Sequence, residues 1–147
     1  MDESYKNTNL ELSIVSPVYM AEGILYRLVE EISNACDLIK KNYEIIVVDD
    51  GSEDNSWAEI KKICKENNIV KGLKLSRNFG QHVAIKAGIK KANGNWIVVM
   101  DCDLQDNPYE IKNLYNKALE GYPIVRAKRK KRKDHFFKKL SSIIFYK

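Results

Sequence analysis

The chain has 147 residues, of which 44% are hydrophobic and 31% are charged, and its formal net charge is +5. This size and composition fit one globular domain and argue against a disordered chain, and three cysteines without CxxC spacing argue against a disulfide framework. No apolar run approaches the ~20 residues of a membrane-spanning helix and the polar start is unlike a signal peptide, so we expect a cytoplasmic protein.

The first half of the chain alternates between strand and helix patterns. Residues 10–18 have the pattern of a strand, and apolar residues then recur at helical spacing over 24–39. Residues 43–48 predict a second strand, whose continuous apolar side chains are typical of a strand covered on both faces. Ser56 and Glu59 have the spacing of a capping box, which predicts that they open the next helix.

The second half continues this alternation. Residues 70–75 predict a third strand, residues 81–92 a helix, and residues 96–100 a fourth strand. A further helix is expected to begin at Asn107-Pro108, because proline is tolerated at the first helical position, and residues 122–127 predict a fifth strand. The order of elements predicts an α/β fold, with a mostly parallel sheet and helices on both of its faces.

Polar motifs follow three of the predicted strands. Pro17-Val18-Tyr19 comes after the first strand, Asp49-Asp50-Gly51-Ser52 after the second, and Asp101-Cys102-Asp103 after the fourth. The carboxyl ends of parallel strands meet at one edge of the sheet. If the strand order is 3-2-1-4, the first and fourth strands are neighbours and flank the crevice in which such folds bind ligands.

The two aspartates after the fourth strand are the first candidates for a metal site. In an extended segment Asp101 and Asp103 point the same way, roughly 7 Å apart. Paired carboxylates suit Mg²⁺ or Mn²⁺, and burying them without a cation is costly. The alternative is that they are ordinary loop residues before a helix, the role expected for Asp106 and Asn107.

Four segments, taken in order, resemble family 2 glycosyltransferases of the GT-A fold. They are Ile14 to Glu22, Val47 to Ser52, Ser76 to Gly80, and Met100 to Asp106. The last is most similar to the branch of polyprenyl- and dolichol-phosphate sugar transferases. The resemblance covers about residues 10–147, and in that family the catalytic domain continues further.

The resemblance implies a division of the chain into three parts. Residues 1–9 would be an N-terminal tail, residues 10–127 a nucleotide-sugar-binding GT-A domain, and residues 128–147 a basic segment with an amphipathic helix. The implied reaction moves a sugar from a nucleotide-diphosphate sugar to a polyprenyl phosphate or a growing cell-surface glycan. It would be metal-assisted and would invert the anomeric carbon.

For the nucleotide, the resemblance implies that Pro17, Tyr19 and Glu22 line the base pocket and that Asp50 accepts a hydrogen bond from the base. An ionised carboxylate only accepts hydrogen bonds, so it suits the imide N–H of uracil. UDP is therefore favoured. GDP remains an alternative, because guanine also offers N–H donors. One departure from the family is Met20, where asparagine is common, and it places a hydrogen bond of this loop in question.

For the diphosphate, the resemblance implies that Asp101 approaches the ribose and phosphates, while Asp103 and Gln105 hold a Mg²⁺ or Mn²⁺ ion to which Asp101 also contributes. Arg129 falls near a family arginine that meets the donor diphosphate. Lys or Arg and a cation would together stabilise the charge of the departing nucleoside diphosphate.

Other candidates also have a structural alternative. Asp49 and Arg77 are counted with the nucleotide-binding residues, but taken alone Asp49 and Asp50 are equally explained as loop residues that cap a helix, and residues 77–80 as a turn. Tyr19 is alternatively a core aromatic residue. His82 is interpreted as a structural residue at the start of a helix.

The positive charge of the chain is concentrated near its end. Residues 126–139 contain nine Lys or Arg and one Asp, while the rest of the chain has 16 basic and 19 acidic residues. The basic run could be a solvated loop. It could also bind nucleic acid, which we do not expect because no reader motif is present.

The residues that follow the basic run leave two further interpretations open. Phe136, Phe137, Leu140, Ile143 and Ile144 share one helical face. With the basic run they would suit an anionic membrane surface, so the protein would lie peripherally at the cytosolic face. The same face could instead pack on another part of the domain, and exposed sheet edges would allow a homo-oligomer.

Two functions other than glycosyl transfer remain as alternatives. One is a non-catalytic fragment that binds a nucleotide or a membrane. The other is a phosphohydrolase with Asp101 as nucleophile and Asp103 as acid and base, although that chemistry usually has Thr or Val at the position of Gln105.

Overall fold

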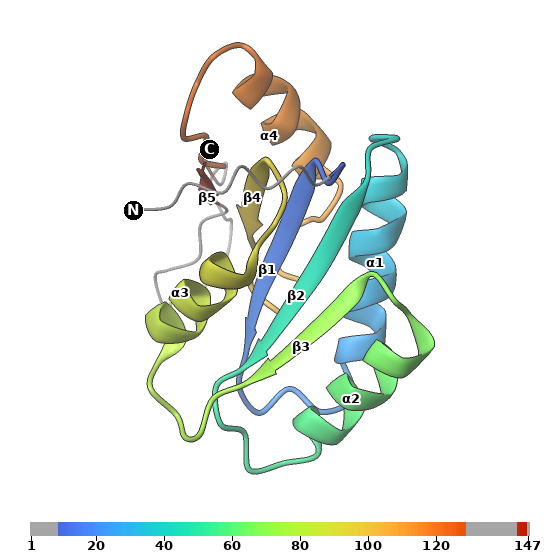
Figure 1. The fold of residues 1–147 in the computed structure, drawn as a ribbon, viewed down its shortest axis with the longest axis vertical. Coiled ribbons are helices and arrows are strands. Elements are labelled where there is room, and N and C mark those ends of the chain that lie inside the picture. The colour runs from blue at the N-terminus through green and yellow to red at the C-terminus, as the bar shows by residue number, and fades with distance from the viewer. Residues whose placement is uncertain (1–8, 129–143, 147) are drawn as a thin grey trace, which may run out of the picture.

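The computed structural model describes residues 9–128 and 144–146 (Figure 1). In chain order the elements are β1 (Leu12–Val18), α1 (Leu25–Asp37), β2 (Tyr43–Asp49), α2 (Ser56–Glu66), β3 (Val70–Lys74), α3 (Gln81–Lys91), β4 (Trp96–Val99), α4 (Glu110–Leu119) and β5 (Ile144–Tyr146). They form a sheet of order β3-β2-β1-β4-β5, in which the first four strands are parallel and β5 is antiparallel to β4. The predicted fold class and the order 3-2-1-4 are confirmed.

Helices cover both faces of the sheet, which explains why the central strands are apolar along their length. All seven residues of β1 are buried, and so are six of the seven in β2. The helix α3 packs on one face through Ala84, against Val15, Ile46 and Val48. The helices α1, α2 and α4 cover the other face and share a second, larger core (Figure 1). In the part of the chain that the structure describes, no helix is long and apolar enough to cross a membrane.

The fifth strand predicted at residues 122–127 is wrong. In this segment Val125 and Ala127 pack against the larger core, while Tyr122 and Ile124 are exposed. The segment cannot extend the sheet beside β4, because β5 already pairs with that edge. Ile144 therefore belongs to a strand, not to the predicted amphipathic helix. The rest of that helix lies outside the described residues, as does the basic run after Lys128.

A buried carboxylate ties the sheet together at the amino ends of its strands, away from the motifs that the sequence singled out. Glu44 is 2% exposed. Its Oε1 accepts hydrogen bonds from Ser13 Oγ at 2.6 Å and from the backbone N–H of Asn93 at 2.7 Å, and its Oε2 accepts one from Lys71 Nζ. Burial alone would raise the pKa of Glu44, but the hydrogen bonds from these three residues outweigh it and lower the pKa. The side chain of Glu44 is therefore ionised in the folded protein.

Replacing Glu44 by glutamine is expected to lower the free energy of unfolding near neutral pH by about 1–3 kcal/mol, because Lys71 loses its partner and the buried hydrogen bonds weaken. The pKa of Glu44 is lower in the folded state than in the unfolded one. Its stabilising effect is therefore present above the unfolded pKa and is lost as pH falls through the folded pKa. Urea denaturation at neutral and at acidic pH measures both effects.

The matched control is Glu30→Gln, which removes the same charge from the exposed surface of α1. We expect it to change stability by less than about 0.5 kcal/mol. A Glu44→Gln protein as stable as the wild type at neutral pH would contradict this role of Glu44. A loss of stability in Glu44→Gln that stays the same at acidic pH would also contradict it.

Candidate functional site

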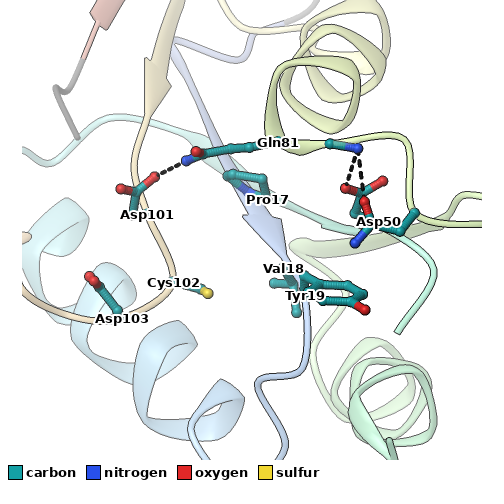
Figure 2. Close-up of a pocket in the computed structure, with 10 residues that line it drawn as sticks. Pro17, Val18, Tyr19, Asp50, Gln81, Asp101, Cys102 and Asp103 are labelled. Atoms are coloured by element: carbon teal, nitrogen blue, oxygen red, sulfur yellow. Dashed lines mark hydrogen bonds between the residues drawn. The ribbon is translucent and has the colours of Figure 1, made fainter. Parts of the chain in front are cut away.

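A cavity of about 340 Å³ opens where the parallel strands end (Figure 2). Its wall is built by four segments: residues 17–19 at the end of β1, Asp50 after β2, residues 78–81 at the start of α3, and residues 101–103 after β4. Within the third segment the lining residues are Asn78, Gly80 and Gln81. The structure thus brings together five predicted site residues, namely Pro17, Tyr19, Asp50, Asp101 and Asp103.

Asp50 organises one side of the cavity. It is 3% exposed, and its Oδ1 and Oδ2 accept hydrogen bonds from the backbone N–H groups of Phe79 at 2.9 Å and Gly80 at 2.8 Å. The neighbouring Gly51 has φ +70° and lies directly against the backbone of Arg77, where an added Cβ would be 2.3 Å from a carbonyl carbon. Asp50 and Gly51 together fix the loop that leads into α3.

Asp101 and Asp103 lie on the opposite side, but not in the extended geometry that the sequence argument assumed. The strand β4 ends at Val99, residues 102 and 103 form a turn, and Leu104 has a positive φ of 56°. Asp101 Oδ1 accepts a hydrogen bond from Gln81 Nε2 (Figure 2). Asp103 Oδ1 accepts one from the backbone N–H of Gln105 at 3.0 Å. The alternation of a strand therefore does not set the directions of these two carboxylates.

Four of the predicted site residues are not among those that line the cavity. Glu22 accepts hydrogen bonds from Asn55, at 2.8 Å from its Nδ2 and 3.2 Å from its backbone N–H. Arg77 is exposed and stacks over Phe79, 4.7 Å from the ring centre. The side chain of Gln105 is also exposed beyond the cavity.

Asp49, the fourth of these residues, is fully buried and supports the turn that follows β2. Its Oδ1 accepts a hydrogen bond from the backbone N–H of Ser52 at 3.0 Å, and its Oδ2 lies 3.9 Å from Lys74 Nζ. Its contacts are those of a structural residue. The remaining candidate, Arg129, lies outside the described residues.

The loop after β1 is held by side chains from the turn that precedes α2 and from the first turn of α2. Its backbone N–H groups at residues 20–23 each donate to a different acceptor, in order Ser52 Oγ, Ser56 Oγ, Asp54 Oδ2 and Glu59 Oε2, at 2.8–3.2 Å. The capping box expected at the start of α2 is therefore wrong, because Ser56 and Glu59 cap the neighbouring loop instead of their own helix. This contact fixes the loop next to Tyr19, whose side chain is 47% exposed on the cavity wall.

Some residues of the wall were not among the predicted site residues, although Asn78, Gly80 and Cys102 belong to segments that carry the family resemblance. Asn78 and Gly80 line the cavity from the loop before α3, Gln81 lines it from the first position of α3, and Cys102 lines it from between the two aspartates. Burial, with the nearby charges of Asp103 and Asp101, raises the pKa of Cys102 to about 11, so its thiol is protonated at neutral pH and is a poor nucleophile. The available signal was position: residues 78–81 follow the carboxyl end of β3, as the other three segments follow their strands.

The charge of the cavity wall is one-sided. Of the described residues that line it, three are aspartates and none is Lys or Arg. Within the same described part of the chain, no three His, Cys, Asp or Glu side chains converge closely enough to hold a metal ion by themselves. A cation at this wall would therefore need ligands beyond these carboxylates.

Comparison with known proteins identifies relatives of this chain. The family model described as glycosyl transferase family 2 matches residues 13–146. A relative from Aeromonas hydrophila subsp. hydrophila, named undecaprenyl-phosphate 4-deoxy-4-formamido-L-arabinose transferase, is 41% identical over 143 residues, which are 96% of this chain and 44% of that protein. The chain spans less than half the length of the curated relatives it matches.

Solved structures resemble the chain in fold. The mannosyltransferase PcManGT from Pyrobaculum calidifontis, in complex with GDP-Man and Mn²⁺, has a TM-score of 0.57 at 17% identity, over 67% of this chain and 29% of that one. S. aureus TarS 1-349, in complex with UDP-GlcNAc, has a TM-score of 0.54 at 23% identity, over 64% of this chain and 27% of that one. These likenesses agree with the predicted GT-A fold.

Proposed function

The chain belongs to glycosyltransferase family 2, and from that premise we propose that it forms the donor-binding part of an enzyme that moves a sugar from a nucleotide-diphosphate sugar to a polyprenyl phosphate. The observation that carries the proposal is the cavity at the carboxyl ends of the strands. It has a buried acceptor, Asp50, on one side and the pair Asp101 and Asp103 on the other. The family match also favours a transferase over the phosphohydrolase.

The side of the cavity with Asp50 is proposed to take the base. Tyr19 is half-exposed beside Pro17 and offers a flat surface on which a base can stack. Each Asp50 oxygen already accepts one backbone N–H, and a carboxylate oxygen has room for a second hydrogen bond. An acceptor that cannot donate suits the imide N–H of uracil, so UDP is the favoured nucleotide and GDP the alternative.

The side with Asp101 and Asp103 is proposed to take the diphosphate together with a Mg²⁺ or Mn²⁺ ion. A diphosphate placed among three aspartates, with no Lys or Arg on the described wall, would be repelled unless a cation lay between them. The residues fit such an ion, because Mg²⁺ is usually held by one or two carboxylates plus substrate phosphates and keeps several waters. When bound, the cation would stabilise the negative charge of the leaving nucleoside diphosphate.

The acceptor is proposed from the relatives. The Aeromonas relative is named for transfer to undecaprenyl phosphate, and this chain matches it over 96% of its own length. A polyprenyl phosphate lies in a membrane, so the basic segment after residue 127 is proposed to contact an anionic membrane surface at the cytosolic face. Gln105 and Arg129 remain candidates for contacts to the cation and the diphosphate.

The proposal is tested by incubating the chain with undecaprenyl phosphate in detergent, Mn²⁺ and radiolabelled UDP- or GDP-sugars in turn. We expect a labelled lipid product, or slow release of free sugar from the donor, and both should stop when EDTA removes the cation. Binding of nucleotide with neither product would show a non-catalytic fragment. An aspartyl-phosphate trapped at Asp101 would show a phosphohydrolase instead.

A further inference from the structure

The side chain of Gln81 spans the gap between the two sides of the cavity (Figure 2). Gln81 is the first residue of α3, and its Nε2 donates a hydrogen bond to Asp101 Oδ1 at 2.5 Å. The side chain is exposed and belongs to neither hydrophobic core, so packing does not account for where it points. Its contact with the acidic side of the cavity needs another explanation.

The backbone that carries Gln81 is held firmly. The N–H of Gly80 donates to Asp50 Oδ2 at 2.8 Å and to Asn78 Oδ1 at 3.0 Å. Gly80 has φ +95° and ψ 151°, a conformation that residues with a Cβ rarely adopt. Asp50 therefore fixes the start of α3, and Gln81 extends from that fixed point to Asp101.

We propose that Gln81 is a positioning residue for Asp101, which it holds toward the cation and diphosphate of the donor; this inference rests on the proposed function. Asp101 sits just beyond β4 beside a turn, where the strand does not fix its rotamer. A side-chain amide restricts the carboxylate without neutralising it. A Lys or Arg at residue 81 would instead form an ion pair with Asp101 and compete with a cation.

The test is the affinity for UDP, or for GDP if the wild type prefers it, measured by calorimetry with Mn²⁺ and with EDTA. Gln81→Met keeps the length of the side chain and removes its amide. We expect it to weaken nucleotide binding roughly tenfold with Mn²⁺, as loss of a residue that orients a metal ligand does, and to leave binding in EDTA unchanged. The matched control is His82→Met on the next, exposed residue, and we expect wild-type affinity under both conditions.

A second measurement does not depend on how the variants fold. In the ¹⁵N-labelled wild type, the side-chain amide signal of Gln81 should shift when Mg²⁺ and nucleotide are added together, because its partner Asp101 changes environment. Equal Mn²⁺-dependent affinity of wild type and Gln81→Met, or a Gln81 signal that does not move, would overturn the inference while the proposed function stands. A wild type whose nucleotide affinity is the same with and without cation would overturn both.

Discussion

Replacing Asp101 by asparagine is expected to lower kcat/KM for sugar transfer by about 10²–10³-fold, the loss typical when one group that stabilises transition-state charge is removed. Asparagine has the same shape as aspartate, and its Oδ1 can still accept the hydrogen bond from Gln81. The substitution therefore removes the negative charge and leaves the local structure in place. Transfer to undecaprenyl phosphate at saturating Mn²⁺ is the measurement.

The control for Asp101→Asn is Asp37→Asn. Asp37 is an exposed aspartate at the end of α1 that does not line the cavity, and its carboxylate accepts a hydrogen bond from Tyr43. This variant should keep activity within about threefold of the wild type, because exposed charges far from the site contribute little. If Asp101→Asn kept a similar share of activity, Asp101 would have no part in binding the donor or its cation.

The second large effect is expected for Gly51→Ala, which should lower the free energy of unfolding by about 2–4 kcal/mol. Its new Cβ would lie 2.3 Å from the carbonyl carbon of Arg77 and 2.6 Å from the backbone nitrogen of Asn78, and backbone cannot turn aside as a flexible side chain does. The loop would have to move away from Asp50, which holds it through Phe79 and Gly80. Nucleotide affinity should therefore fall together with stability.

Gly23→Ala separates the two causes of this effect. Gly23 has φ +84°, close to the +70° of Gly51, but an added Cβ there would meet no atom within 4 Å. It should cost only the backbone strain of about 1 kcal/mol. Urea denaturation of both variants measures how much unfolding free energy each one loses. Equal losses would show that the close approach of Gly51 to residues 77–78 has no energetic consequence.

The order of the elements could be predicted because each depends on local pattern. Residues 43–48 and 96–100 are apolar along their length, as expected for parallel strands covered on both faces, and they form β2 and β4 within one residue. The strand predicted at 122–127 does not form, and the local sequence pattern could not have indicated this. Its alternation is real, with Val125 and Ala127 turned inward, but the edge of β4 pairs with residues far along the chain.

Part of the site could be predicted for a similar reason. The carboxyl ends of parallel strands share one edge, and this alone brings Pro17, Asp50 and Asp101 to one cavity. The direction of each side chain could not be predicted. Ser56 and Glu59 have the same spacing whether they cap their own helix or the loop after β1, and only the packing of α2 beside that loop decides between these outcomes.

The proposed donor site is tested most directly by a crystal structure of the protein soaked with UDP and Mn²⁺. We expect a uracil against Tyr19 with its imide N–H on Asp50, and a diphosphate with a Mn²⁺ ion beside Asp101 and Asp103. Nucleotide bound elsewhere on the protein would contradict it. So would a diphosphate that lies in the cavity without any cation between it and the two aspartates.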